Sequence, residues 1–353
     1  MADGRRHGTA PPTGHAARPT GGVAYAPHRR ARTSGVSRMV DRARERSVVH
    51  GYRAASATLS RVTPRVSLPI ARGLFLAGYY AWGEKRRIVQ ANAARVLRRP
   101  VDDPEVARLA RRIFATYSRF AVELMRLPGR PADEPARLMR SDGVRGGESF
   151  IALFERTRAS GRGMIVVSGH IGSIDVLAGA FASRGMPTYG VADDSAYPEL
   201  FEVLNSQRGR WGVRVIPWRN LRQMFRVLRD AAILGLVVDW GYRPDDMPVR
   251  LFGSWTTLPA GPAVLAAKTG ALIVPVVCRR QADGTFDARH DDPIEVADPS
   301  PPALLRATQA VAGALEAMIA EAPEQWYSFK PMWPATEEEA ARLEARAREM
   351  ASA

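Results

Sequence analysis

Two patterns of hydrophobic positions alternate along the chain from about Gly147 onward. Short runs of apolar, often β-branched residues predict buried strands, and stretches with apolar residues every three or four positions predict helices packed on them. Strands are expected over 164–167, 188–192, 213–216, 234–239 and 272–278, and helices over 150–159, 176–183, 200–210, 221–231, 261–269 and 304–322. This alternation predicts an α/β fold with a layered, mixed sheet flanked by helices. A turn at Gln281–Gly284 predicts an antiparallel end to the sheet, and a long loop is expected after residue 239.

The segment before this region is predicted to be helical. Residues 67–94 combine an aromatic and aliphatic face (Leu74, Phe75, Tyr79, Tyr80, Trp82) with a basic end. That pattern fits a helix lying in a membrane interface, and it fits equally well a helix packed on a globular core. A second helix is expected from Pro104 to about Met125, because acids and a proline favour a helix start.

Four regions follow from these patterns. Residues 1–47 hold ten arginines and three acids and are expected to be a disordered, arginine-rich tail. Residues 48–140 form the N-terminal helical part, residues 141–335 the α/β core, and residues 336–353 a charged C-terminal helix. The tail reads as a solvated segment or as an electrostatic tether to anionic lipid.

Charge and cysteine content narrow the classes of partner. The net charge is +15, and only three lysines occur, so arginine carries nearly all of the positive charge. A basic balance allows nucleic acid, an anionic membrane surface or phosphorylated small molecules as partners. The single cysteine, Cys278, excludes an internal disulfide and a cysteine zinc cluster. No run of about 18 apolar residues occurs, so a full membrane span is not expected.

His170 is the best candidate for a general base. It follows the expected strand at 164–167, where small residues break the pattern before a helix begins. Functional groups of open α/β sheets gather outside the carboxyl ends of the strands. Asp175, in the first turn of that helix, is expected to orient His170 and stabilise its charged form. The alternative is a buried histidine that forms only structural hydrogen bonds.

Other catalytic and metal-binding patterns are missing from the sequence. No G-x-S-x-G surrounds a serine, and no P-loop occurs. His290 lies among aspartates and is expected in a solvated loop rather than at a metal site, so no metal is predicted. A base without a nucleophile indicates direct transfer, in which a substrate hydroxyl attacks an activated acyl group.

A resemblance to a known family extends over roughly residues 68–335. Gly169-His-Ile-Gly-Ser-Ile-Asp175 resembles the H-x-x-x-x-[DE] motif of membrane-lipid acyltransferases. The ordered set of segments, including Leu236-Val-Val-Asp239, Leu258-Pro-Ala-Gly-Pro-Ala-Val-Leu-Ala266 and Pro323-Glu-Gln-Trp-Tyr327, is similar to the lipid A lauroyl/myristoyl acyltransferase superfamily. Within it, the closest group is that of the actinobacterial phosphatidylinositol mannoside acyltransferases. The family's aromatic-rich Asn-Trp-[DE] is Ser173-Ile174-Asp175 here.

The resemblance implies an acyltransferase with a glycerolipid-acyltransferase-like fold and a catalytic core at 141–335. His170 would deprotonate an acceptor hydroxyl, and Asp175 would orient it. Asp193 and Asp194 would contribute to the acceptor site, Asp239 would act as a supporting or substrate contact, and Arg243 would meet phosphate. Arg243 fits a solvated loop equally well.

The expected activity is transfer of a fatty acyl chain from acyl-CoA to a hydroxyl of a phosphatidylinositol mannoside-like membrane glycolipid. No cofactor is implied; acyl-CoA or an acyl carrier protein is the co-substrate. The expected partners are that donor, the lipid acceptor and an anionic membrane surface, at the cytoplasmic face of the cell membrane, with no nucleic acid. A lysophospholipid or natural-product acyltransferase, or a non-catalytic basic binding protein, is the alternative.

Overall fold

Alternating strands and helices dominate the computed structural model, which describes residues 35–141, 148–195 and 197–353. Residues 44–353 form one unit, to which the following account applies. The strands are β1 Met139–Ser141, β2 Met164–Ser168, β3 Thr188–Ala192, β4 Arg214–Pro217, β5 Ile233–Val237, β6 Met247–Leu251, β7 Ser254–Leu258, β8 Leu272–Arg280 and β9 Phe286–His290. The helices are α1 Gly35–Arg61, α2 Pro64–Ala81, α3 Gly83–Leu97, α4 Pro104–Arg126, α5 Glu134–Leu138, α6 Phe150–Ala159, α7 Ile174–Ser183, α8 Pro198–Gly209, α9 Leu221–Arg229, α10 Gly261–Thr269, α11 Pro301–Glu321 and α12 Glu337–Ser352, with 3₁₀ turns at Leu127–Gly129 and Pro323–Gln325.

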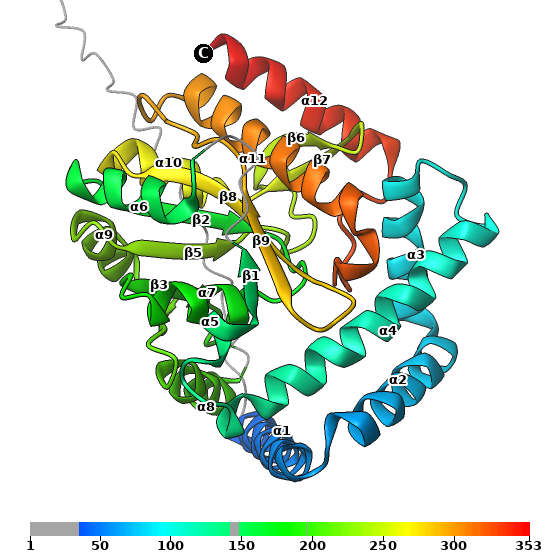
Figure 1. Ribbon diagram of the computed structural model, residues 1–353. Helices are drawn as coiled ribbons and strands as arrows, with labels where there is room; N and C mark the ends of the chain where they lie inside the picture. The colour runs from blue at the N-terminus through cyan, green and yellow to red at the C-terminus, as the bar shows by residue number, and fades with distance from the viewer. Residues whose placement is uncertain (1–34, 142–147, 196) are drawn as a thin grey trace, which may run out of the picture. The chain divides into compact units, whose positions relative to one another are not determined.

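Seven of the strands form one mixed sheet in the order β1-β9-β8-β2-β5-β3-β4 (Figure 1). The strands from β8 to β4 are parallel, while β9 runs antiparallel to β8 and β1 runs parallel to β9. The predicted fold class, a mixed sheet flanked by helices and preceded by N-terminal helices, is therefore confirmed. The predicted antiparallel end is the β8–β9 hairpin.

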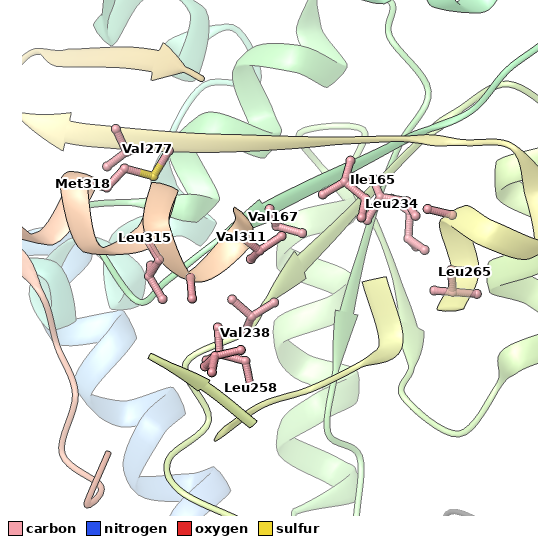
Figure 2. Packing of buried hydrophobic residues seen from close by; sticks show 14 of the residues in the cluster. Ile165, Val167, Leu234, Val238, Leu258, Leu265, Val277, Val311, Leu315 and Met318 are labelled. Atoms are coloured by element: carbon pink, nitrogen blue, oxygen red, sulfur yellow. The ribbon is translucent and has the colours of Figure 1, made fainter. Parts of the chain in front are cut away.

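The sheet is buried on both faces around β2. Ile165 and Val167 point into one core with α11, and Met164 and Val166 point into a second core with α6 and α7. This alternation follows from the two-residue period of a strand, and burial on both faces explains why β2 is apolar at consecutive positions. Figure 2 shows the first core, where side chains of the sheet meet Val311 of α11.

Helix α11 is the one helix among the described residues that is long and apolar enough to cross a membrane. Of its most apolar window, 44% is buried inside the protein. Leu315 and Ile319 belong to the main core, so the hydrophobicity of α11 is accounted for by packing against the sheet.

The N-terminal helices differ from the expected single helix over 67–94. The chain leaves helical geometry at Trp82, which ends α2 and precedes α3. Helix α2 packs along α4 (Figure 1). Between the two helices, Phe75 and Tyr79 form edge-to-face contacts with Tyr117 and Phe114. Of the two positions expected for this aromatic face, in a membrane interface or on the protein core, Phe75 and Tyr79 occupy the second.

Two further expectations need correction. The loop expected after residue 239 contains the antiparallel β6–β7 hairpin, whose apolar residues Val249, Leu251 and Leu258 are buried in the main core. The disordered tail expected over 1–47 is wrong for 35–47, where α1 has begun. Residues 1–34, the rest of that tail, lie outside the described residues. The charged helix expected within 336–353 corresponds to α12, whose first turn carries Glu337, Glu338 and Glu339.

Candidate active site

The carboxyl ends of β2 and β5 bring His170 and Asp239 together. These neighbouring strands pair in register, with Ser168 opposite Val237. His170 and Asp239 each lie two residues beyond this last pair, and the amide of Val238 donates to the carbonyl of Ser168 at 3.0 Å. The two segments that follow these neighbouring parallel strands leave the sheet side by side, so they carry His170 and Asp239 to the same edge.

Three hydrogen bonds converge on the carboxylate of Asp239. Its Oδ1 lies 2.7 Å from His170 Nδ1, and its Oδ2 accepts from the His170 backbone amide at 2.9 Å and from Trp326 Nε1 at 2.8 Å. Because a carboxylate only accepts, Nδ1 carries the proton and Nε2 is the basic nitrogen. Nε2 has no hydrogen-bond partner in the described part of the chain, so it is available to a substrate.

The electrostatics of this pair follow from burial and mutual attraction. The Asp239 side chain is fully buried and that of His170 is 39% exposed. Burial lowers the pKa of His170, but the charge and hydrogen bond of Asp239 outweigh it and hold that pKa above its ordinary value. Burial raises the pKa of Asp239, whereas His170 and its other donors more than offset this and keep the pKa low. The carboxylate is therefore ionised near neutral pH and stabilises a protonated imidazole.

Glycine is required twice in the turn that carries His170. A Cβ on Gly169 would lie 2.8 Å from Leu315 Cδ1 and 3.1 Å from Asp239 Oδ2. Gly172 has φ +60°, and a Cβ there would lie 1.8 Å from the carbonyl oxygen of Cys278. These close approaches let the turn lie against β8, where the amide of Ser173 donates to that same carbonyl at 3.1 Å.

A cavity of about 220 Å³ opens beside His170. Its walls come from α4, the turn after β2, the residue after Asp239 and the segment after Trp326. They are Tyr117, Phe120, His170, Ile171, Gly172, Ile174, Asp239, Trp240, Tyr327, Ser328, Phe329 and Lys330. The amide of Tyr327 donates to the His170 carbonyl at 2.8 Å, which holds the last of these segments beside the base. A basic nitrogen next to a largely apolar and aromatic cavity suits chemistry on an apolar substrate.

Asp175 does not contact His170, contrary to the expectation from the sequence. Ser173 caps α7, so Asp175 lies in its first turn, and its Oδ1 accepts from Arg208 Nε of α8 at 2.6 Å. Burial lowers the pKa of Arg208, but Asp175 outweighs it and raises that pKa above its ordinary value. Asp175 therefore joins α7 to α8, and the carboxylate that orients His170 is Asp239.

The remaining candidate residues lie around the site without lining the cavity. Asp193 and Asp194 follow β3; Asp193 Oδ1 accepts from Ser195 and from Trp218 Nε1, at 3.1 Å for the latter. Asp194 Oδ1 is buried and has no hydrogen-bond partner among the described residues. The side chain of Arg243 is exposed in the loop after β5.

No group of three metal-ligating side chains occurs in the described ranges. His290 lies in β9 and is 5% exposed, and both ring nitrogens lie within 3.1 Å of backbone carbonyl oxygens. The solvated loop expected around it is therefore wrong, because β9 pairs with β8 there.

Cys278 is buried, which raises the pKa of its thiol and makes it a poor nucleophile.

Sequence reasoning missed the roles of Trp326, Lys330 and Arg208. Trp326 is 2% exposed and supports Asp239, whereas the sequence marks it only as part of the family-like segment Pro323-Glu-Gln-Trp-Tyr327. Lys330 lines the cavity. One signal was present for Lys330, since it is one of only three lysines in the chain.

Comparison with known proteins identifies the family. The sequence pattern of the bacterial lipid A biosynthesis acyltransferases matches residues 59–334. A phosphatidylinositol mannoside acyltransferase of Mycolicibacterium smegmatis is 30% identical over 304 residues, which cover 83% of this chain and 94% of that protein. Phosphatidylinositol mannoside acyltransferases of two Mycobacterium tuberculosis strains, CDC 1551 and H37Rv, are each 28% identical over 288 residues, covering 77% of this chain and 84% of theirs. The chain is an acyltransferase and belongs to the bacterial lipid A biosynthesis acyltransferase family.

Proposed function

We propose that this acyltransferase moves a fatty acyl chain from acyl-CoA to a hydroxyl of a phosphatidylinositol mannoside-like membrane glycolipid. The observation that carries the proposal is the His170–Asp239 pair at 2.7 Å, with Nε2 free beside an aromatic cavity. The relatives named for phosphatidylinositol mannoside acylation support the choice of acceptor.

In the proposed reaction, His170 acts as a general base. The acceptor hydroxyl oxygen attacks the thioester carbonyl carbon while Nε2 removes the hydroxyl proton. The C–S bond then breaks, and the CoA thiolate leaves and receives this proton from the imidazolium. Asp239 keeps the proton on Nδ1 and stabilises the imidazolium, a general-base contribution of about 10²–10⁴ in rate. Asp175 supports the site through Arg208 rather than by contact with the base.

The acceptor side of the site is proposed to include Asp193 and Asp194. They follow β3, which pairs with β5, so they lie at the same carboxyl edge of the sheet as Asp239. The exposed carboxylate of Asp193 can accept a hydrogen bond from a sugar hydroxyl. Arg243 is proposed to meet a substrate phosphate.

A bilayer contact is proposed for the outer face of α2. Val66, Ile70 and Leu74 are 52%, 58% and 68% exposed, and their four-residue spacing puts them on one stripe of the helix. The 18 residues of α2 contain two arginines and no acid, which favours an anionic lipid surface. Since α2 packs on α4, whose Tyr117 and Phe120 line the cavity, lipid held there lies near the site. The proposed location is peripheral, at the cytoplasmic face of the cell membrane, and the exposed apolar stripe of α2 supports the peripheral contact.

The test is direct acyl transfer. Purified protein is incubated with isotopically labelled palmitoyl-CoA and an actinobacterial lipid extract, and the lipids are resolved by mass spectrometry. Label in phosphatidylinositol mannosides, abolished by His170→Ala, is the expected result. Label only in diacyl phospholipids would show that a lysophospholipid is the acceptor, and label that persists undiminished in His170→Ala would overturn the mechanism.

A further inference from the structure

Three cationic side chains from distant parts of the chain, Lys330, Arg243 and Lys85, lie close enough to act electrostatically on one another beside the cavity that Lys330 lines. Lys330 lines the cavity together with His170, and its Nζ lies 5.2 Å from the centre of the Trp240 ring. Lys330 and Arg243 are exposed, and Lys85 is half-buried. Solvent and ligands can therefore reach this cluster, which we call the cationic mouth.

Backbone contacts fix the three segments to one another. The amide of Tyr242, next to Arg243, donates to the carbonyl of Pro331, next to Lys330, at 2.8 Å. Lys85 Nζ of α3 donates to the carbonyl of Phe329 at 3.2 Å. These hydrogen bonds hold the backbone next to Arg243, the backbone next to Lys330 and the Nζ of Lys85 close to one another.

The cationic mouth lacks close ion-pair partners among the described residues, although the charge of Asp246 acts on Arg243 from a longer distance. None of the three forms an ion pair with a described carboxylate, whereas Arg208, Arg279 and Arg280 each do. Burial lowers the pKa of Lys330, and the nearby charges of Arg243 and Lys85 lower it further, while those of Asp193 and Asp239 raise it.

The two carboxylates that act electrostatically on Lys330 accept hydrogen bonds from other groups and form no ion pair with it. Asp239 accepts from His170 and Trp326, and Asp193 accepts from Ser195 and Trp218. Clustered cations without carboxylate partners, beside a cavity, are the arrangement that recognises a phosphate.

We propose that Lys330, Arg243 and Lys85 form a subsite for a substrate phosphate, which positions the reacting groups at His170. The inference rests on the proposed function, because that reaction has two phosphate-bearing substrates. The phosphates of CoA and the phosphodiester of the inositol lipid share the chemistry that these cations recognise. The experiment separates the two sources.

The experiment measures binding without turnover, by calorimetry at low salt on the full-length protein. CoA probes the donor phosphates, pantetheine is the same thiol arm without nucleotide, and glycerophosphoinositol probes the phosphodiester of the acceptor. The variants are Lys330→Gln and Arg243→Gln. The matched control is Lys268→Gln, which changes the remaining lysine, exposed near the end of α10.

The expected result is that each site variant weakens binding of one phosphate probe by about tenfold or more, the value of a charge-assisted hydrogen bond. Pantetheine binding and the control variant stay unchanged, and Lys330→Arg retains most of the affinity. A loss confined to CoA assigns the subsite to the donor, and a loss confined to glycerophosphoinositol assigns it to the acceptor.

The proposal is overturned if wild-type protein binds neither phosphate probe, or if the site variants match Lys268→Gln for both. A protein that shows charge-dependent CoA binding but no acyl transfer to any lipid would sink the proposed reaction and leave the phosphate subsite standing. The two inferences therefore fail separately.

Discussion

Replacing Asp239 by asparagine tests whether this carboxylate sets the tautomer of His170. An asparagine side chain has one acceptor oxygen and one amide that only donates. In the native site, one oxygen faces His170 Nδ1, while the other accepts from two buried donors, the His170 amide and Trp326 Nε1. The asparagine oxygen can occupy only one of these two positions.

The hydrogen bonds that each orientation of the introduced asparagine keeps or loses determine the difference in free energy between the two orientations. With the oxygen toward Nδ1, the tautomer is correct, but two buried donors lose their acceptor, at about 1–3 kcal/mol each. With the oxygen toward those donors, the amide of the introduced side chain donates to Nδ1 and forces the proton onto Nε2. The loss of both hydrogen bonds costs about 2–6 kcal/mol in the first orientation. The population of the second orientation is therefore higher by roughly 30-fold to 10⁴-fold.

Asp239→Asn is therefore expected to lower kcat by about that factor while leaving the fold intact, because both buried donors stay paired. The assay is the initial rate of label transfer from palmitoyl-CoA to lipid, with thermal unfolding as the check on folding. Asp292→Asn makes the same chemical change at an exposed position after β9 and should keep the wild-type rate. An Asp239→Asn rate within about threefold of wild type would refute the reasoning.

The remaining predictions concern the base, the ion pair and the membrane. His170→Ala should lower turnover by at least about a hundredfold with little change in KM for acyl-CoA, which steady-state kinetics measures. His170 is active only when it is neutral, and its pKa is raised above 6.5, so kcat/KM should fall as the pH drops through that raised pKa. A pH–rate profile in which this fall has its midpoint below pH 6.5 would contradict the prediction. Asp175→Asn should lower the free energy of unfolding by roughly 3 kcal/mol, because it leaves the charge of Arg208 unpaired, and denaturant titration measures the loss. The double variant Ile70→Glu and Leu74→Glu should pellet with anionic vesicles at least about tenfold less well than wild type, and pelleting equal to wild type would remove α2 from the interface.

Local patterns predicted most of the elements of the core because their periods are local properties. Phe150–Ala159, Thr188–Ala192 and Gly261–Thr269 have the expected bounds. The β6–β7 hairpin was missed because its strands contain a proline, an arginine, threonines and a tryptophan, which hide the alternation. Its burial comes from α11, which lies elsewhere in the sequence.

The partner of His170 could not be predicted from spacing. Asp175 is five residues away in sequence, but the helix start turns it toward α8 and Arg208. Asp239 is distant in sequence and becomes adjacent only because β5 pairs with β2 in register. Which strands are neighbours is decided by the packing of the whole sheet, so the choice between two aspartates required the topology.

The hydrogen bond from Trp326 to Asp239 determines the stage of synthesis at which the site can become complete. The strands β2 and β5 leave the ribosome before residue 326, and domains begin to fold as they emerge. Until Trp326 and Tyr327 arrive, Asp239 lacks a buried donor and the cavity lacks the wall that Tyr327 and Lys330 provide. A nascent chain with a nearly complete sheet therefore holds an unfinished site until Trp326 and Tyr327 have folded onto it.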